Sequence, residues 1–341
     1  MQIEVLSPAL AYSYESFLLR RPETLLYQSW RYQCLLTELL GCSQKTLLAL
    51  GSNKQVLAAL PLMALDGAFG TVFNSLPFYG SNGGLIGEDL AARNAVVAAY
   101  NDMVRQPETP AATVIESPLS SGGSEGLVYQ LVDERIGQLT PLPQLEDPAV
   151  PLMQSFHYKT RNMVRKAEKL GVQVSVDNLA MPFLASAHEE NMQEIGGMAK
   201  SRRFFDAIPV HFRPCEDYRI FLATMDNQAV AAILLFYFNQ TVEYFTPVVR
   251  KEFRETQALS AAIFKAMIDA ASRGYRWWNW GGTWLSQDGV YRFKSRWGTR
   301  DMRYRYLTSV GNRAILEASR YTLQNGYPNF FVVPYSALSD R

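Results

Sequence analysis

Cysteine and histidine are scarce in this chain of 341 residues. The three cysteines lie far apart and form no CxxC pattern, and the three histidines are equally scattered: Cys34, Cys42, Cys215, His157, His188 and His211. This spacing offers neither a zinc site nor the disulfide framework of a secreted domain. It also disfavours a Ser-His-Asp or Cys-His triad. We therefore expect no metal and no resident cofactor, and a reaction that needs little nucleophilic help, such as aminolysis of an activated ester or thioester.

Long hydrophobic runs and an excess of one charge are also lacking. The longest apolar run, 229–238, is too short to span a bilayer and indicates a buried strand. The opening residues M-Q-I-E-V-L-S-P lack the basic and apolar regions of a signal peptide. A formal net charge of +1 argues against a protein that coats nucleic acid, but it leaves local basic patches open. We expect a soluble, cytoplasmic protein, with peripheral contact to a membrane as an open alternative.

What is present is an α/β alternation that occurs twice. The first copy has apolar strands at 45–51, 55–65 and 70–74, a helix at 89–105 capped by Asp89, and a strand at 111–116. The second has strands at 218–224, 229–238 and 241–247, a helix at 256–273 ended by Gly274, and a strand at 276–280. A repeat of this kind indicates two copies of one unit. The alternative is the ordinary alternation of any α/β protein.

The predicted fold class is therefore α/β, with mixed sheets in two tandem domains. The proline-rich stretch 140–151 is expected to form the linker between them. We place the first domain at 1–150 and the second at 151–310, and we expect 311–341 to pack back on the first.

Three segments could carry chemistry. In 156–172, one face of a predicted helix is basic, and its Arg161 and Arg165 are suited to bind phosphate oxygens. The alternative is a solvated helix face. The glycine-rich loop 73–87 follows a strand but lacks the G-K-[ST] of a P-loop. Its glycines would let the backbone approach a ligand, with Tyr79 and Asn82 as polar contacts, unless the loop is a plain cluster of turns.

The third segment combines aromatic and basic residues. Five of the six tryptophans fall between Trp277 and Trp297. Six basic residues in 292–305 oppose only Asp301: Arg292, Lys294, Arg296, Arg300, Arg303 and Arg305. Basic side chains among aromatics suit a nucleotide or a polyphosphate, so we predict a binding cleft for a phosphate-bearing substrate here.

These motifs together resemble the Fem-type branch (FemAB and FemX) of the GNAT-like acyltransferases. The resemblance covers R-N-M-V-R-K-A-E-K-L-G-V, W-N-W-G-G-T, G-V-Y-R-F-K-S-R-W-G and, in the first half, S-L-P-F-Y-G-S-N-G-G-L. It implies two GNAT-like domains and transfer of an acyl group to an amine. Members studied so far use aminoacyl-tRNA to extend lipid-linked peptidoglycan precursors, and relatives act in envelope polysaccharide pathways.

The resemblance also implies site residues. It would place Lys294 at the acyl donor, where its ammonium would stabilise developing charge. Tyr291, Phe293 and Trp297 of the same segment become candidates for substrate contact, and the five arginines at 292, 296, 300, 303 and 305 for donor binding. Glu116 stands where relatives often carry an aspartate, and it is the candidate proton acceptor.

The choice of donor and acceptor is open at this point. The GNAT pyrophosphate loop should precede the helix at 256–273, but 248–258 contains no glycine, which favours a tRNA 3′ end over coenzyme A. The predicted function is transfer of an aminoacyl group to a lipid- or nucleotide-linked amine of an envelope or polysaccharide precursor. The alternatives are an acyl-CoA-dependent transferase acting on a nucleotide-linked amino sugar and a non-catalytic RNA-binding module.

Overall fold

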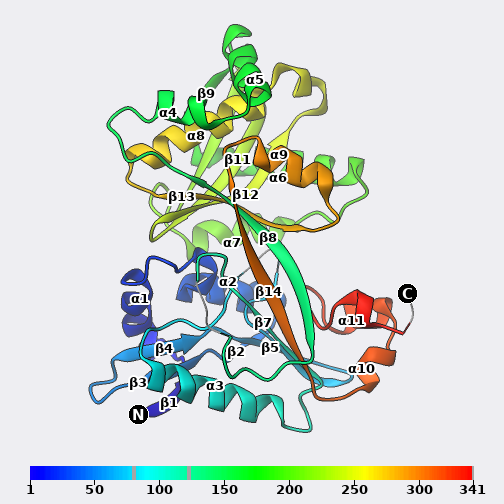
Figure 1. The fold of residues 1–341 in the computed structure, drawn as a ribbon. Coiled ribbons are helices and arrows are strands. Elements are labelled where there is room, and N and C mark those ends of the chain that lie inside the picture. Colours follow the sequence, from blue (N-terminus) through cyan, green and yellow to red (C-terminus); the bar gives the residue numbers. More distant parts are fainter. Residues whose placement is uncertain (79–81, 121–123, 340–341) are drawn as a thin grey trace. The chain divides into compact units, whose positions relative to one another are not determined.

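The chain folds into two compact units. The computed structural model describes residues 1–78, 82–120 and 124–339, so Tyr79, a predicted substrate contact, lies outside the described residues. One unit comprises Met1–Arg135 and Arg303–Arg341, and the other comprises Ile136–Met302. Strand β8 (Leu131–Pro141) leads from the first unit into the second, and strand β14 (Arg300–Val310) leads back (Figure 1). The chain thus changes unit at 135/136 and 302/303, whereas the expected domain boundaries were 150/151 and 310/311.

The first unit contains two sheets. A small sheet has the order β1-β3-β4, and β2-β5-β6-β7-β14 lie in that order in the other. The strands are β1 (Gln2–Val5), β2 (Ser43–Gln44), β3 (Leu47–Leu50), β4 (Val56–Leu60), β5 (Met63–Gly67), β6 (Gly70–Asn74) and β7 (Ala111–Ile115). The helices are α1 (Ala11–Leu19), α2 (Trp30–Leu40), α3 (Leu90–Val104), α10 (Ala314–Glu317) and α11 (Arg320–Gly326).

Helix α3 connects the parallel strands β6 and β7. It begins where predicted, because the Asp89 carboxylate accepts a 2.8 Å hydrogen bond from the Ala92 amide. Its buried face, with Val96 and Tyr100, packs against both sheets. The predicted single strand 55–65 is wrong. Pro61 has no N–H to donate, and the run divides there into β4 of the small sheet and β5 of the other.

The C-terminal residues pack on the first unit. Ile315, Leu323 and Tyr327 form one buried cluster with Val72 of β6 and Ala111 of β7. The Tyr327 hydroxyl donates to the Gly70 carbonyl at 2.9 Å and accepts from the Phe69 amide at 3.1 Å. The segment after β14 therefore completes the core of a unit whose other elements come from residues 1–135 and from β14.

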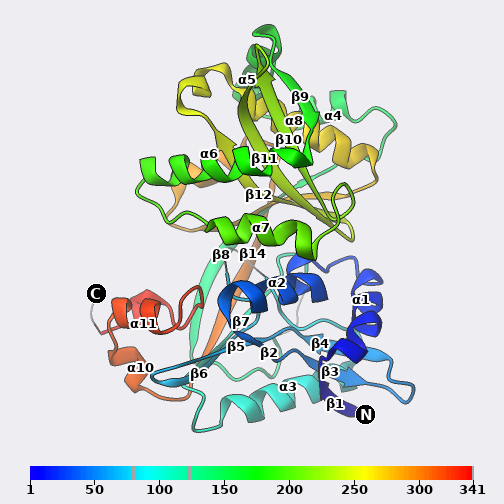
Figure 2. The ribbon, with the colours of Figure 1, turned by 180° about the vertical axis from the view of Figure 1, so that it is seen from behind.

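The second unit has the strand order β8-β13-β12-β11-β10-β9. Its further elements are α4 (Ala149–Ser155), α5 (Tyr158–Lys169), β9 (Gln173–Val176), α6 (Met181–Glu194), α7 (Arg202–His211), β10 (Tyr218–Met225), β11 (Gln228–Phe238), β12 (Thr241–Val249), α8 (Ala258–Ser272), β13 (Trp277–Trp284) and α9 (Asp288–Ser295). Helix α8 covers one face of the sheet with α5 packed against it, and α6 and α7 cover the other face (Figures 1 and 2).

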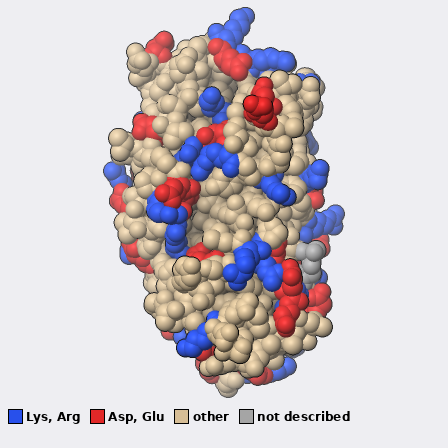
Figure 3. All heavy atoms as spheres, turned by 90° about the vertical axis from the view of Figure 1, so that its left-hand side faces the viewer, with Lys and Arg blue, Asp and Glu red and all other residues tan. Residues whose placement is uncertain are grey.

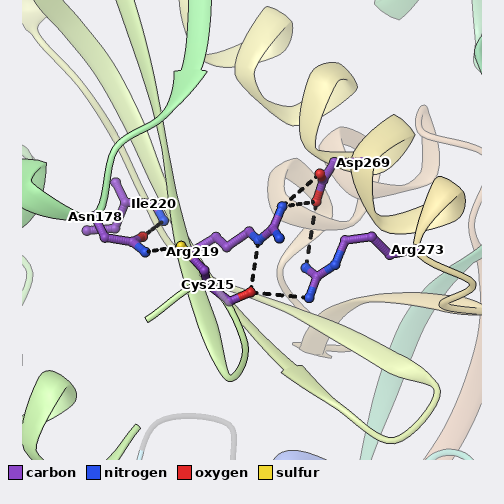
Figure 4. Close-up of polar contacts among 6 residues, drawn as sticks. All are labelled: Asn178, Cys215, Arg219, Ile220, Asp269 and Arg273. Carbon is purple, nitrogen blue, oxygen red and sulfur yellow. Dashed lines mark hydrogen bonds and ion pairs between the residues drawn. The ribbon is translucent and has the colours of Figure 1, made fainter. Parts of the chain in front are cut away.

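A polar cluster joins α8 to the start of β10. The Asp269 carboxylate accepts two hydrogen bonds from Arg219, at 2.8 and 3.0 Å, and lies 3.7 Å from Arg273 (Figure 4). Both arginines also donate to the Cys215 carbonyl, and the Arg273 guanidinium lies 4.3 Å from the centroid of the Tyr237 ring. One carboxylate therefore holds two cations from two elements.

The order of strands and helix predicted for the second copy is confirmed by β10, β11, β12, α8 and β13. Strands β10, β11 and β12 pair antiparallel, and β12 and β13 pair parallel across α8. The proline-rich stretch 140–151 is the end of β8, a loop and the start of α4 rather than an extended linker. No helix in the described residues is both long and apolar enough to cross a membrane.

Candidate functional site

Strands β12 and β13 diverge in the second unit. They pair in parallel from Thr241↔Trp277 to Glu243↔Asn279, yet β12 continues to Val249 and β13 to Trp284. The pairing of β12 with β11 has a bulge just beyond this point, where Leu234 and Leu235 of β11 face Thr246 and Tyr244, and a bulge bends the strand that carries it. Backbone N–H and C=O groups along diverging strands are available to an extended ligand that pairs with them as a strand would. This divergence is the candidate ligand site of the second unit.

Lys294 of α9 reaches the divergent part of β13. Its Nζ donates to the carbonyls of Gly281 and Gly282, at 3.3 and 3.1 Å, and to the Thr283 hydroxyl at 2.9 Å. The side chain is 7% exposed, and this burial lowers the pKa of the ammonium to about 8. The structure thus puts the predicted catalytic lysine beside β13, with its three N–H groups directed at acceptors on that strand.

The tryptophans around Lys294 form a core and not a cleft. Trp278, Trp280 and Trp297 are at most 2% exposed, and the Trp280 ring lies 5.6 Å from Trp297 and 5.9 Å from Phe293. The Trp280 indole N–H donates to Thr140 at 2.9 Å, which ties β13 to β8. The prediction that Trp297 contacts substrate is therefore wrong for this structure, because its ring is enclosed. The aromatics anchor α9 on β13 and so fix Lys294.

The other residues of the segment lie at the surface of α9 and just beyond it. The Tyr291 hydroxyl donates to Asp301 at 2.7 Å, and Phe293 is 37% exposed. Arg292 pairs weakly with Asp288 at 3.8 Å, and the Arg300 guanidinium lies 6.0 Å from the Trp277 ring centroid. Arg296, at the C-terminus of α9, is partly exposed. Three of the predicted donor-binding arginines, Arg292, Arg296 and Arg300, belong to this unit.

The remaining two, Arg303 and Arg305, belong to the first unit. They line a pocket of about 220 Å³ together with Gly84, Ser117, Ser120 and Glu116. The Glu116 carboxylate accepts three hydrogen bonds from Arg305, from the backbone amide at 2.9 Å and from the guanidinium at 3.1 and 2.8 Å. This ion pair raises the pKa of Arg305 above its ordinary value. Glu116 therefore orients an arginine in this structure.

Residues 82–84 of the glycine-rich loop lie at the corresponding divergence of the first unit. Parallel pairing of β6 and β7 covers Phe73↔Ala112 and Asn74↔Thr113. Beyond it, the Gly83 amide donates to the Ile115 carbonyl at 3.0 Å, and Asn82 Nδ2 donates to the Glu116 carbonyl at 2.9 Å. A Cβ on Gly83 would lie 2.5 Å from the Ser75 carbonyl oxygen. The close approach predicted for these glycines is thus to the chain's own backbone, which occupies this divergence.

Arg161 and Arg165 lie together, as their i, i+4 spacing on α5 requires. They line a pocket of about 650 Å³ with Glu168, and its apolar part comes from α4 and α8: Ala149, Val150, Met153 and Phe264. The Arg161 guanidinium donates to the Phe156 carbonyl. The pocket combines two cations with an apolar floor, which suits an anionic group carried on an apolar body.

The N-terminus of α8 has little capacity left for an anion. The amides of Ser260 and Ala261 donate to the Gln257 carbonyl at 2.9 and 3.2 Å, and the Ala258 amide donates to Thr256 Oγ1 at 3.3 Å. The nearby cations are also paired. Arg250 donates to Glu190 at 2.6 Å, and Arg254 and Lys251 contact Glu194, whose pKa is lowered chiefly by the Arg254 hydrogen bond. Figure 3 shows acidic side chains beside groups of basic ones on one face.

Sequence reasoning missed a buried polar pair at the divergence. Glu243 and Asn279 are each 1% exposed, and Asn279 Nδ2 donates to Glu243 Oε2 at 2.8 Å. The available signal was an acid inside the apolar strand T-V-E-Y-F and an asparagine between tryptophans. A buried carboxylate is rare and requires hydrogen-bonding partners, so both positions mark a special local role.

Residues 154–295 match a family model described as an acetyltransferase (GNAT) domain. Among curated proteins, none matches the chain in sequence. Solved structures with a similar fold include FemX, at 15% identity and a TM-score of 0.68, covering 90% of this chain and 97% of FemX. The C-terminal domain of a putative lysylphosphatidylglycerol synthetase from Agrobacterium fabrum aligns at 10% identity and a TM-score of 0.54, covering 95% and 98%.

A tandem GNAT protein from the clavulanic acid biosynthesis pathway aligns at 13% identity and a TM-score of 0.50, covering 91% of this chain and 98% of that one. The agreement with FemX and with this protein extends over nearly the full length of each chain. The predicted α/β fold with two tandem GNAT-like domains is thereby confirmed. The chain has the tandem fold of FemX and of this GNAT protein, and its residues 154–295 are similar to an acetyltransferase (GNAT) domain.

Proposed function

We propose that this protein is an N-acyltransferase that transfers an aminoacyl group from aminoacyl-tRNA to an amine of a cell-envelope or polysaccharide precursor. The choice of donor rests on the hydrogen bonds and ion pairs at the N-terminus of α8. The amides of Ala258, Ser260 and Ala261 donate within the chain, and the cations before the helix are paired with Glu190 and Glu194. A coenzyme A pyrophosphate would have to displace both sets of partners, because such a ligand is normally held by free amides at a helix N-terminus. An aminoacyl ester on a tRNA 3′ end has no pyrophosphate to place there.

The proposed chemistry takes place where β12 and β13 diverge. The amine nitrogen of the acceptor attacks the ester carbonyl of the donor, the N–C bond forms, and the ester C–O bond breaks. The proton lost by nitrogen ends on the leaving ribose oxygen. Negative charge develops on the carbonyl oxygen in the transition state, and the Lys294 ammonium or a backbone N–H of a diverging strand would stabilise it. In that state the Lys294 Nζ would exchange one strand carbonyl for the oxyanion.

Two pockets are the candidate sites for a phosphate-bearing acceptor. The pocket of Arg161 and Arg165 offers two guanidinium groups above an apolar floor, and the pocket of Arg303 and Arg305 offers hydroxyl groups from Ser117 and Ser120. Guanidinium groups bind phosphate in bidentate fashion, which suits a lipid- or nucleotide-linked amine. Asn82, beside the second pocket, remains a proposed contact through its amide.

A non-catalytic RNA-binding module is less consistent with the burial of Lys294. A lysine that only attracts RNA needs an exposed ammonium, whereas this one is 7% exposed and donates to three acceptors of β13. Burial of this kind costs free energy and is typical of groups with tuned chemistry.

The test supplies charged tRNA and acyl-CoA in parallel with candidate amine acceptors and identifies the product by mass spectrometry. We expect an aminoacylated product with charged tRNA that disappears after RNase treatment. Turnover that survives RNase and requires acyl-CoA would overturn the choice of donor and favour the acyl-CoA-dependent transferase. RNA binding without any product from either donor, over a broad acceptor panel, would overturn the enzyme proposal.

A further inference from the structure

Two consecutive carbonyls of β13 point at one ammonium group. In a regular strand the carbonyls of neighbouring residues alternate between the two sides, so Gly281 and Gly282 should not both reach Lys294. The strand is irregular here: Gly281 has φ = +74°, a left-handed conformation that sets the direction of its own carbonyl relative to the strand before it. The direction of one of the three acceptors of Lys294 therefore depends on the backbone conformation of this glycine.

The Asn279 side chain is placed to hold that conformation. Its Oδ1 accepts a 2.9 Å hydrogen bond from the Gly281 amide, two residues further along the chain. Such a side-chain-to-backbone bond stabilises a local turn. An asparagine amide can rotate by 180°, which would offer Gly281 an N–H in place of an acceptor. Something must therefore fix the orientation of the amide.

Glu243 fixes it. Its Oε2 accepts from Asn279 Nδ2 at 2.8 Å, and a carboxylate accepts from N–H groups but cannot donate to Oδ1 when it is ionised. The pair occupies the last paired position of β12 and β13, and both side chains are enclosed. A charge-assisted hydrogen bond in such surroundings is stronger than one in water. Glu243 thereby acts on β13 through Asn279.

The Thr283 hydroxyl is the third acceptor of the Lys294 ammonium and links it to α9. Its hydroxyl accepts from Lys294 and donates to Gln138 Oε1 at 3.1 Å, and Gln138 Nε2 donates to the Tyr291 carbonyl of α9 at 3.4 Å. Lysine, strand and helix thus belong to one buried network. We propose that the Glu243–Asn279 pair is a positioning device for Lys294, which holds Gly281 in the left-handed conformation and so directs the Gly281 carbonyl at the ammonium.

The first test measures the position of Lys294 without any assay of activity. The folded protein is treated with an amine-acetylating reagent, and modification of Lys294 is followed by peptide mass spectrometry, with the exposed Lys166 as internal control. In Asn279→Ala we expect modification of Lys294 to become several-fold faster while that of Lys166 is unchanged. Glu243→Gln should lie between wild type and Asn279→Ala, closer to wild type, because its amide oxygen still accepts from Asn279 while its N–H group could also face Oδ1. Glu243→Ala should behave like Asn279→Ala.

A second variant keeps the test decisive if Asn279→Ala does not fold. Gly281→Ala adds a methyl group that meets no atom within 4 Å, so it acts through the left-handed backbone, which disfavours any residue with a Cβ. It should also expose Lys294 to the reagent. Modification of Lys294 that remains as slow as in wild type in folded Asn279→Ala or Gly281→Ala protein would overturn the proposal.

The second test rests on the proposed function. Misplacing a catalytic group by about 1 Å can cost roughly 100-fold in rate. We expect Asn279→Ala to lose kcat by about 10- to 100-fold with little change in donor KM, and Glu243→Gln to retain most of kcat. If wild-type protein transfers no acyl group, the proposed function fails while the modification test still decides on the pair. If wild type is active and Asn279→Ala retains kcat, the pair does not position a catalytic lysine.

Discussion

The burial of Lys294 determines which of its two protonation states is present near neutral pH. Its ammonium is removed from water by α9 and the aromatic core, and within the described chain it donates to two carbonyls and a hydroxyl, which are uncharged acceptors. Desolvation disfavours the charged form, so the pKa falls from the ordinary 10.5 to about 8. An ordinary surface lysine would stay charged to a much higher pH.

The first prediction follows for activity. If the ammonium stabilises the oxyanion, turnover should fall as pH rises through about 8, because the neutral amine cannot supply the charge. Lys294→Met should lose on the order of 100-fold in kcat, and its residual rate should lack this descending limb. The measurement is a profile of kcat against pH for both proteins. A rate that rises through pH 8 in wild type but not in Lys294→Met would instead make Lys294 a base.

The same shift has a consequence for stability. The folded-state pKa lies below the unfolded value, so between about pH 8 and 10.5 the unfolded chain binds more protons than the folded one. The contribution of Lys294 to the free energy of unfolding therefore rises with pH across this window. Chemical denaturation of wild type and Lys294→Met at about pH 7.5 and pH 10 should show a pH-dependent difference between the two proteins. Equal pH dependence would contradict the lowered pKa.

At the scale of elements, glycines determine where the backbone can pack. The loop that fills the β6/β7 divergence passes so close to Ser75 that a side chain at Gly83 would overlap the Ser75 backbone. At Gly289 in α9, by contrast, an added Cβ would have no atom within 4 Å. Gly83→Ala should destabilise the protein by about 1–3 kcal/mol through overpacking. Gly289→Ala should stabilise it by up to about 1 kcal/mol through helix propensity. Urea denaturation measures both, and a stable Gly83→Ala variant would mean that the loop can shift.

Replacing Asp269 tests how strongly its polar cluster attaches α8 to the sheet. Asp269→Ala removes the carboxylate that holds Arg219 and leaves two partly buried guanidinium groups close together. We expect a loss of about 1–3 kcal/mol in the free energy of unfolding. Asp288→Ala is the matched control, since its pair with Arg292 is exposed and 3.8 Å long, and it should change stability by less than about 0.5 kcal/mol. Comparable losses in the free energy of unfolding of the two variants would show that the Asp269 cluster stabilises the protein no more than an exposed ion pair does.

Local patterns predicted several helix ends in both units. Asp89, Gly171 and Gly274 mark helix ends by rules that act within a few residues, and the structure agrees with each of them. Helix α9 escaped prediction because its glycine and its mixed aromatic and basic residues obscure the helical period. The role of Glu116 depends on Arg305, 189 residues away, and that of Glu243 on Asn279, 36 residues away. Pairings over such distances are set by topology, which no local pattern encodes.

At the scale of the whole molecule, the two units carry the same strand–helix–strand element but use it differently. In the first unit, residues 82–84 hydrogen-bond where β6 and β7 part, whereas in the second unit the diverging strands are lined by Glu243, Asn279 and Lys294. A divergence already occupied by the chain has fewer backbone groups to offer a ligand. We therefore expect one acyl-transfer site per chain, in the second unit, with the first unit contributing to recognition of a substrate.

The last prediction concerns how such a molecule would hold a tRNA. Each neutralised phosphate releases counterions, so donor affinity should fall with salt, with a slope of roughly −0.7 per phosphate on a single strand. Arg292 is 71% exposed and Arg300 is exposed as well, so Arg292→Gln with Arg300→Gln should make the slope shallower by about 0.7 for each phosphate that the variant no longer neutralises.

Arg305→Gln should leave the slope unchanged, because its guanidinium is engaged by Glu116. Arg105→Gln, at the C-terminal end of α3 and 61% exposed, is the control for a general reduction of positive charge. Binding of charged tRNA, followed by fluorescence anisotropy from about 50 to about 300 mM salt, measures these slopes. An unchanged slope in the Arg292/Arg300 variant would show that these two arginines do not contact phosphates of the tRNA. An equal change in Arg105→Gln would show that they act only through long-range attraction.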